Sequence, residues 1–303
     1  MVRRETGGPG RGAGTRLVRD HPSRRCWAAW QDRGMTRPPL AEIPTGPVPV
    51  PPAVRSLVDT AGGGDLVPVW KNDLGGLTFR WGTDRYVKWV AAGTPEIDLL
   101  AEAERLAWAS RFATVPRVLD AGQDEVGAWL VTEAIDAASA VDPRWIAEPA
   151  TAAAAIGHGL RVLHDALPVE DCPFTWSVEQ RVARADERIA DGEGPTEWFP
   201  EHAQLSVAEA RPLLDLAPPV DRLVVCHGDA CAPNTLLAAD GSFAAHVDLG
   251  SLGVADRWAD LAVAAWSTEW NYGPGYDGIV YEAYGTEPDK ERIAYYRLLW
   301  DLG

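Results

Sequence analysis

The sequence contains no long apolar run and few cysteines. No stretch of about 18 consecutive apolar residues occurs, which argues against a membrane-spanning helix. The four cysteines, Cys26, Cys172, Cys226 and Cys231, form no C-x-x-C pair and follow no secretory signal. Free thiols in a reducing cytoplasm are therefore expected. The G-x-x-x-x-G-K-[ST] pattern of Walker-type NTPases is also missing.

Lysine is scarce as well, and positive charge is unevenly placed. Three lysines, Lys71, Lys88 and Lys290, stand beside 25 arginines, so each lysine merits an explanation. Residues 1–34 carry eight arginines and three acidic residues. Since the whole chain has a net charge of −16, the rest of it carries −21. Such a body repels nucleic acid and anionic membranes, so neither is expected as a partner, and it attracts polycations unless its acidity serves only solubility.

Composition divides the chain into three parts. Residues 1–34 are rich in Gly and Arg without apolar periodicity, which predicts disorder, and Met35 is the expected true start of translation. The prolines of residues 38–52 predict an extended lead-in. We therefore expect a disordered extension over 1–45, a nucleotide-binding N-terminal lobe over 46–135 and a catalytic C-terminal lobe over 136–303.

The two lobes differ in their predicted secondary structure. Five strand-like runs fall in the first lobe, near residues 66–70, 77–81, 85–90, 117–121 and 128–132, with a helix from about 95 to 110. After residue 136 the pattern is mainly helical, with helices expected at 150–166, 177–189, 207–216, 258–270, 279–284 and 289–302. This order predicts a bilobal α+β chain with a small five-stranded antiparallel N-lobe and a larger, mainly helical C-lobe.

One stretch, residues 226–260, contains the polar residues that a kinase needs. Asp229 follows a His-Gly pair, Asn234 comes five residues after it, and Asp248 follows fourteen residues later. In kinases one Asp accepts the proton of the acceptor hydroxyl, while an Asn and another Asp hold magnesium on the nucleotide phosphates. The order and spacing of the three residues therefore predict a kinase active site.

Two further residues of this stretch are expected to support its structure. Asp260 lies in the first turn of the helix predicted at 258–270, where the helix dipole favours a carboxylate. From there it can also brace the loop that carries Asp229. His227 is expected to hydrogen-bond within that loop rather than to transfer a proton.

The N-lobe contains a matching pair of charges. Lys88 lies inside a predicted strand, and on the following helix Glu102 shares the apolar face of Leu99 and Leu106. A carboxylate on that face needs a cation, because an unpaired buried charge is costly. Lys88 is the expected partner and would also reach the nucleotide phosphates. A purely structural ion pair is the alternative.

Gly75 and Gly76 lie in the turn between the first two predicted strands. Glycines let a backbone approach phosphate closely with its N–H donors, so this turn is a candidate for nucleotide binding. An ordinary hairpin turn has the same pattern and is the alternative.

Four segments together resemble the aminoglycoside 3'-phosphotransferases, and they are HGDACAPN, HVDLGSLGVADRWADLA, YVKWV and YYRLLWDL. The resemblance covers roughly residues 55–303. It implies a protein-kinase-like fold that uses ATP and magnesium to phosphorylate an antibiotic hydroxyl. The H-G-D-x-x-x-x-N motif alone is shared with choline, homoserine and macrolide kinases, whereas D-L-G-x-x-G-x-A-D-R-x-x-D-L-A is more specific to the aminoglycoside branch.

The resemblance implies roles for the residues that match the family's catalytic motifs. Asp229 would be the catalytic base, with Asn234 and Asp248 as magnesium ligands. Lys88, held by Glu102, would contact the phosphates. Ser251 departs from the family pattern, because many members have Arg there.

Nucleotide and substrate contacts follow from the same resemblance. Tyr86 would stack on adenine, and the linker with Thr132 and Ala134 would bind its edge. The substrate carries ammonium groups, so acidic side chains are expected to bind it. The candidates are Asp191, Glu193, Glu269 and Asp301.

The expected function is ATP- and magnesium-dependent phosphorylation of the 3'-hydroxyl of aminoglycosides, as by a kanamycin kinase, which confers antibiotic resistance. A monomer or weak dimer is expected. The first alternative is another small-molecule kinase of the same fold, acting for example on an amino alcohol. The second is a pseudokinase, which predicts a missing catalytic residue, whereas Asp229, Asn234, Asp248 and Lys88 are all present. The sequence alone leaves the choice between ATP and GTP open.

Overall fold

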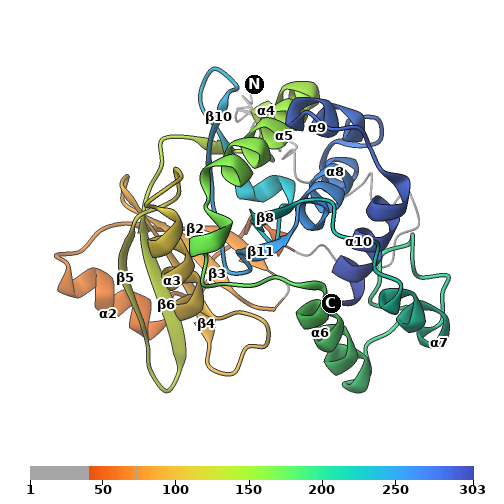
Figure 1. The fold of residues 1–303 in the computed structure, drawn as a ribbon. Coiled ribbons are helices and arrows are strands. Elements are labelled where there is room, and N and C mark those ends of the chain that lie inside the picture. The colour runs from red at the N-terminus through yellow and green to blue at the C-terminus, as the bar shows by residue number, and fades with distance from the viewer. Residues whose placement is uncertain (1–40, 73) are drawn as a thin grey trace, which may run out of the picture.

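An antiparallel sheet flanked by two helices forms the N-terminal part of the chain (Figure 1). The structure is a computed structural model that describes residues 41–72 and 74–303. The disorder predicted for residues 1–34 and the start predicted at Met35 lie outside these residues. In the order β1-β2-β3-β4-β6-β5, the strands of the sheet are Ala41–Glu42, Leu66–Asn72, Leu77–Trp81, Arg85–Ala91, Gly127–Glu133 and Val118–Gln123.

The five predicted strands all occur within two residues of their expected bounds, and β1 adds a short edge strand. Every pair of neighbouring strands is antiparallel, as expected. Successive side chains of a strand point to opposite faces of the sheet. Val87 therefore faces helix α2 (Pro52–Thr60), whereas Lys88 and its cross-strand neighbour Leu130 face helix α3 (Leu99–Ala109).

Helix α2 was not predicted, because the prolines before it indicate extended chain. Pro52 is in fact the first helical residue, where its missing N–H costs no hydrogen bond. Val54 and Val58 follow at a spacing of four and bury themselves against Phe79 and Trp81 of the sheet.

Helix α3 begins later than the sequence predicts. Pro95 was the expected first residue, but the helix starts at Leu99. The reason is Asp98, whose side chain accepts hydrogen bonds from the backbone N–H groups of Leu100 and Ala101 at 3.0 and 2.9 Å. This N-cap satisfies donors that have no partner inside the helix, and so fixes its start.

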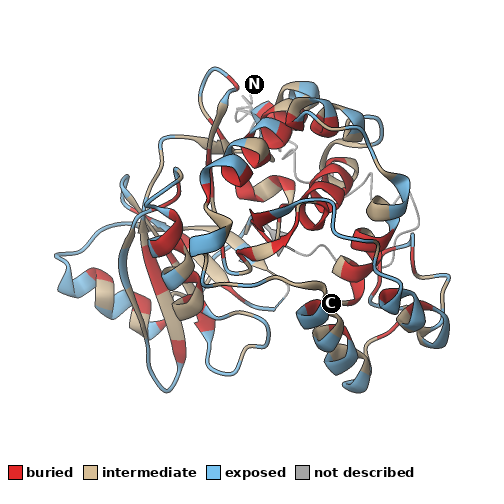
Figure 2. Cartoon of the chain, in the orientation of Figure 1, coloured by how far each residue is buried: buried red, intermediate tan, exposed pale blue. Residues whose placement is uncertain are grey.

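The rest of the chain is mainly helical, as predicted, with α5 and α8 at its centre (Figure 1). Its helices are α4 (Pro143–Ala147), α5 (Pro149–Ala166), α6 (Val178–Ala190), α7 (Val207–Ala210), α8 (Trp258–Tyr272), α9 (Asp277–Tyr284) and α10 (Lys290–Leu302). Figure 2 shows buried residues concentrated on α8, of which residues 258–268 are all buried. The predicted helix 207–216 is wrong in part, because after α7 the segment Arg211–Asp215 is a 3-10 helix that contains Pro212.

Short strands and 3-10 turns position the stretch with the kinase residues. Strand β8 (Leu223–Cys226) pairs with β11 (Gly253–Asp256), and β9 (Thr235–Leu237) pairs with both β7 (Ala138–Ser139) and β10 (Phe243–His246). Asp229 lies after β8, Asn234 ends a 3-10 turn, and Asp248 lies after β10. The two small sheets therefore carry the three residues on adjacent loops.

An aromatic cluster joins α8 to α10 in the C-lobe. The rings of Phe199 and Trp270 stack with centroids 4.5 Å apart, and Trp270 lies 4.8 Å from Trp266 and 5.4 Å from Trp300. Aromatic pairs at such separations stabilise packing beyond their buried area. Among the described residues, no helix is both long and apolar enough to cross a bilayer.

Candidate active site

The ammonium of Lys88 lies between two carboxylates, one from each lobe. Lys88 Nζ donates to Glu102 Oε1 of α3 at 2.7 Å, as the sequence predicts, and lies 2.9 Å from Asp248 Oδ1 of the C-lobe. Glu102 is buried, whereas the side chain of Asp248 is 45 % exposed. The structure thus brings three of the predicted site residues into direct contact across the junction of the lobes.

Sharing one ammonium gives the two carboxylates different proton affinities. Burial acts to lower the pKa of Lys88, but the charges of Asp248 and Glu102 outweigh it and raise that pKa above its usual range. Burial raises the pKa of Glu102 to about 6, against the opposing charge of Lys88. Burial also acts to raise the pKa of Asp248, but the charge of Lys88 outweighs it and lowers that pKa. Asp248 is therefore the carboxylate that stays ionised most readily.

Asp229 and Asn234 form a second contact among the predicted residues. Asn234 Nδ2 donates to both the backbone carbonyl and the Oδ2 atom of Asp229, each at 2.9 Å. Burial, followed by the negative charge of Asp248, raises the pKa of Asp229. The charge of Asp248 therefore contributes to the proton affinity of Asp229.

His227 links the loops that carry these residues. Its Nε2 donates to the carbonyl of Val247 at 2.9 Å, and its Nδ1 accepts from the backbone N–H of Asp229 at 3.3 Å. Val247 in turn donates its N–H to the carbonyl of Asn234 at 3.0 Å. These local hydrogen bonds are of the kind expected for His227, and they fix the position of Asp248, the next residue after Val247.

Asp260 has a fully buried carboxylate, which lies against the loop that carries Asp229. It accepts hydrogen bonds from the backbone N–H groups of His227 at 2.6 Å and Gly228 at 2.9 Å. His164 Nε2 lies 2.9 Å from the same carboxylate, and His164 Nδ1 lies 3.0 Å from the hydroxyl of Tyr284. Burial acts to raise the pKa of Asp260, but its interactions with His164 outweigh this and lower it. The geometry is that of a brace for the loop.

His164 and Tyr284 were given no role by the sequence. The available signal was weak, since a histidine at 164 and a tyrosine at 284 are ordinary residues of helices α5 and α9. Cys231 and Ser267 were also missed. Cys231 hydrogen-bonds to the side chain of Asp229, and Ser267 Oγ accepts from the backbone N–H of Ala232 at 2.8 Å. Both residues help to hold the loop between Asp229 and Asn234.

Two backbone positions let the loops approach each other closely. Gly228 has φ +87°, and a Cβ atom built there would lie 2.1 Å from the carbonyl oxygen of Ser251. Only glycine fits this contact. Asp248 also has a positive φ of 65°, which non-glycine residues adopt rarely and which often occurs at functional sites.

The Gly75-Gly76 turn is closed by hydrogen bonds to Asn72. The N–H of Gly75 donates to the carbonyl of Asn72 at 3.1 Å, and that of Gly76 donates to Asn72 Oδ1 at 2.6 Å. A role of these N–H groups in phosphate binding remains a prediction, since in this structure both are used within the hairpin.

The residues expected to bind adenine lie together at the end of the sheet. Tyr86 of β4 pairs with Thr132 of β6, and both are half-buried. The N–H of Ala134 donates to the carbonyl of Asp84 at 2.8 Å. The predicted contacts of these residues with a nucleotide are not tested by the structure.

The first two of the acidic substrate candidates lie at the end of α6. Asp191 is exposed just after the helix. Glu193 accepts from Arg188 of α6, with Nη2 at 2.6 Å from its Oε2. A cationic substrate at Glu193 would therefore compete with an existing ion pair.

The other two candidates lie on α8 and α10. Glu269 is 3.7 Å from Arg297. Asp301 is 2 % exposed, accepts from the N–H of Phe199 at 2.8 Å and contacts His202 Nδ1 at 2.7 Å. In this conformation Asp301 supports the segment that contains Phe199, and its direct contact with substrate remains a prediction.

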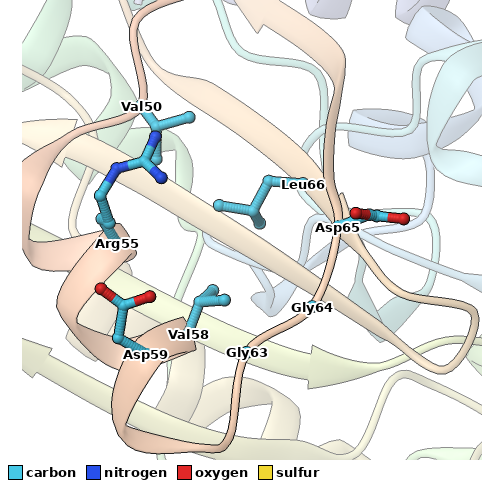
Figure 3. A pocket seen from close by; sticks show the side chains of 8 residues that line it. All are labelled: Val50, Arg55, Val58, Asp59, Gly63, Gly64, Asp65 and Leu66. Atoms are coloured by element: carbon cyan, nitrogen blue, oxygen red, sulfur yellow. The ribbon is translucent and has the colours of Figure 1, made fainter.

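A separate hollow lies between α2 and the start of β2 (Figure 3). Its lining residues are Val50, Arg55, Val58, Asp59, Gly63, Gly64, Asp65 and Leu66. None of the predicted site residues lines it, so it is not part of the candidate active site.

Comparison with known proteins identifies the family that shares this arrangement. A family model described as the phosphotransferase enzyme family matches residues 72–296. An aminoglycoside 3'-phosphotransferase of Streptomyces fradiae is 37% identical over 230 residues, which are 69% of this chain and 82% of that protein. The region that the family model matches contains Lys88, Glu102, Asp229, Asn234 and Asp248.

Two solved structures agree in fold as well as in sequence. An aminoglycoside-3'-phosphotransferase of type VIII superposes with a TM-score of 0.71 at 32% identity, over 83% of this chain and 98% of that chain. The aminoglycoside phosphotransferase APH(3'')-Id from Streptomyces rimosus, in complex with ADP and streptomycin, gives 0.68 at 30% identity, over 82% and 97%. The bilobal kinase-like fold predicted from the sequence is confirmed.

Proposed function

Because the chain belongs to the phosphotransferase enzyme family, we propose that it transfers a phosphoryl group from ATP to the 3'-hydroxyl of an aminoglycoside. One observation carries the proposal: Lys88 contacts Asp248 across the junction of the lobes, and His227 hydrogen-bonds both to the residue before Asp248 and to the backbone of Asp229. The similarity to aminoglycoside 3'-phosphotransferases supports the choice of acceptor. Such a reaction would confer antibiotic resistance.

The donor groups of the site suit magnesium. Asn234 and Asp248 offer amide and carboxylate oxygens, which are the ligands that this hard cation prefers. They lie on adjacent loops joined by the hydrogen bond from Val247 N–H to the carbonyl of Asn234. Magnesium bound there would neutralise charge on the nucleotide phosphates.

Lys88 and Asp229 have complementary roles. The raised pKa of Lys88 keeps its ammonium charged, so it can bind a phosphate oxygen and stabilise negative charge. The raised pKa of Asp229 makes it a better proton acceptor for the substrate hydroxyl. Asn234 donates to the backbone carbonyl and to Oδ2 of Asp229, and so orients that carboxylate.

Negative charge on the C-lobe favours a cationic acceptor. Outside residues 1–34 the chain carries −21, and Asp191, Glu193 and Glu269 are at least partly exposed. An aminoglycoside bears several ammonium groups, so long-range attraction would guide it to the site. We propose that a monomer or weak dimer carries out the reaction in the cytoplasm, where ATP is available.

A second candidate is phosphorylation of a 3''-hydroxyl. The structural similarity to APH(3'')-Id, whose complex contains streptomycin, is close to that of the 3'-enzyme, at TM-scores of 0.68 and 0.71. The fold and the catalytic residues do not distinguish these acceptors, because both reactions need the same base and the same phosphate contacts.

A panel of acceptors tests the proposal. Purified protein, ATP and magnesium are incubated with a 3'-hydroxyl aminoglycoside, its 3'-deoxy analogue, streptomycin and choline, and the phosphate position is read by NMR. We expect the first drug to be phosphorylated at the 3' position and the deoxy analogue to bind without reaction. Preferential turnover of streptomycin would favour the 3''-enzyme, and turnover of choline alone would overturn both assignments.

A further inference from the structure

The loop between β4 and α3 reaches across from the N-lobe to the C-lobe. Glu96 Oε2 lies 2.8 Å from Arg184 Nη2, and Glu96 Oε1 lies 3.7 Å from Arg188 Nε. Both arginines belong to α6, which Figure 1 shows on the side of the C-lobe nearest β4. An ion-pair bridge therefore joins the two lobes outside the Lys88 cluster.

Glu96 holds an unusual backbone conformation at this bridge. Its φ is +65°, in the left-handed region that non-glycine residues rarely adopt. Such a conformation costs free energy and persists only where the surrounding structure holds it. Ile97 packs against the apolar core beside α3, and Arg184 and Arg188 hold the carboxylate on the other side.

The bridge connects directly to the helix that positions Lys88. Two residues after Glu96, Asp98 caps α3 with its side chain. One turn into α3, Glu102 accepts from Lys88 at 2.7 Å. The next turn is tied to the C-lobe by Arg105 Nε, which donates to the carbonyl of Leu252 at 3.1 Å. The loop of Glu96 is thus a second anchor of α3, at its N-terminal end.

Arg188 also joins this anchor to a candidate substrate residue. Its guanidinium lies 2.6 Å from Glu193 and 3.7 Å from Glu96, and its side chain is 19 % exposed. Two carboxylates therefore share one partly buried cation. A change in charge at Glu193 alters how strongly Arg188 attracts Glu96.

We propose that Glu96, Arg184 and Arg188 form an interlobe latch that positions α3, and through Glu102 the ammonium of Lys88, for nucleotide binding. The latch residues act as positioning residues, because none of them needs to touch the nucleotide. The link to Glu193 rests on the proposed function and makes the latch sensitive to a cationic acceptor.

The test uses variants of the full-length protein that break the latch without touching the Lys88 cluster. Glu96→Gln and Arg184→Gln each remove one partner, and the double variant reports whether the two act as one unit. Glu96→Asn tolerates the left-handed backbone but has no charge, so it separates conformation from charge. Asp186→Asn is the matched control, since Asp186 of α6 pairs with Arg211 within the C-lobe, at 3.0 Å from Nη2.

Three readouts are compared: ADP affinity with magnesium by calorimetry, the KM for ATP, and amide hydrogen exchange of residues 97–109 in the protein without ligand. We expect Glu96→Gln, Arg184→Gln and Glu96→Asn to weaken ADP binding by about fivefold, the scale of a partly exposed ion pair, and to speed exchange in α3. The double variant should be no worse than Glu96→Gln. Asp186→Asn should change none of these readouts.

Wild-type ADP affinity and unchanged α3 exchange in Glu96→Gln would overturn the latch, as would an equal loss in Asp186→Asn. Glu193→Gln provides the second arm. It should preserve ADP affinity, because Arg188 becomes free to attract Glu96, while raising the KM for the aminoglycoside. Failure of every aminoglycoside to react would refute the proposed acceptor but would leave the ADP measurements as the test of the latch.

Discussion

The cluster around Lys88 and the cluster around Asp260 satisfy their charges in different ways. Lys88 is 24 % exposed and shares its ammonium between carboxylates of two lobes, one of which is 45 % exposed. Asp260 and His164 have side-chain exposures of 0 % and belong to one lobe. The Asp260 carboxylate is satisfied mainly by backbone N–H groups.

This difference suits the Lys88 cluster to ligand binding and the Asp260 cluster to structural support. The exposed Asp248 can exchange Lys88 for a ligand at low cost, whereas a buried carboxylate with several hydrogen bonds cannot be disturbed without loss of stability. Variants of the first cluster should therefore alter kinetics more than stability. Variants of the second should alter both.

Substitution of Asp229 should have the largest kinetic effect. It tests whether the loop that Asp260 supports contains the general base. We expect Asp229→Ala to lower kcat by about 10²–10⁴-fold, the range for a lost general base. ADP affinity should stay near that of the wild type, because the base acts on the acceptor hydroxyl. Steady-state kinetics and calorimetry measure the two quantities, and near-normal kcat would remove the assigned role.

Lys88→Ala should have the next largest effect on kinetics. Loss of the phosphate contact is expected to reduce kcat/KM for ATP by about 10²–10³-fold, the scale of one removed electrostatic stabiliser. The thermal midpoint should also fall, because the buried Glu102 loses its cation. Lys71→Ala, which removes an exposed lysine of β2, is the control and should retain full activity. Equal losses in both variants would show that general charge, not position, matters.

Asp260→Asn should instead reduce stability. The variant keeps the size of the side chain but removes the charge from the buried carboxylate that contacts His227, Gly228 and His164. We expect a loss of about 3 kcal/mol in the free energy of unfolding, the cost of breaking a buried charged pair. Urea denaturation measures it. If stability is unchanged and only kcat falls, the brace interpretation is wrong.

Glu102→Gln should have the smallest effect, and it depends on pH. A fall of about tenfold or less in kcat/KM for ATP is expected, because the amide can still contact Lys88 but without charge. In the wild type kcat/KM should decline as pH falls through about 6, the pKa of Glu102. The variant should lack this decline. A pH profile that is identical in the two proteins would contradict the assignment.

The raised pKa of Glu102 also predicts that stability changes with pH in the direction opposite to activity. Folding raises the pKa of Glu102 from 4.5 to about 6. Between these two pH values the folded protein therefore binds a proton at Glu102 more tightly than the unfolded chain does. The contribution of the protonated Glu102 to the free energy of unfolding is complete below pH 4.5, and it is lost as the pH rises through about 6. Relative to wild type, Glu102→Gln should therefore gain stability over this interval, as measured by urea denaturation at each pH.

The grouping of Asp229 with Asn234 was predictable because its pattern is local. Asp229 and Asn234 are five residues apart, and Asp248 follows the next strand, so chain order alone brings them together. The Lys88–Glu102 pair was predictable for another reason. A carboxylate on the apolar face of a helix needs a cation, and lysine is scarce enough in this chain to leave few candidates.

Contacts between distant segments could not be predicted in the same way. The pairing of Glu96 with α6 depends on how the lobes lie relative to each other, which no periodicity encodes. His164 of α5 reaches Asp260 of α8 only because these two helices pack against each other. Asp301 has the expected acidic chemistry, but the sequence does not show that it is buried against Phe199.

The packed rings of Phe199, Trp266, Trp270 and Trp300 have a spectroscopic consequence. Indoles held 4.8 to 6.0 Å apart at fixed angles couple their electronic transitions, which produces strong near-ultraviolet circular dichroism. A C-lobe that kept its helices but lost its packing would retain the far-ultraviolet spectrum and lose this signal. The chain thus contains its own optical probe of side-chain order, located on the two helices that also carry Glu269 and Asp301.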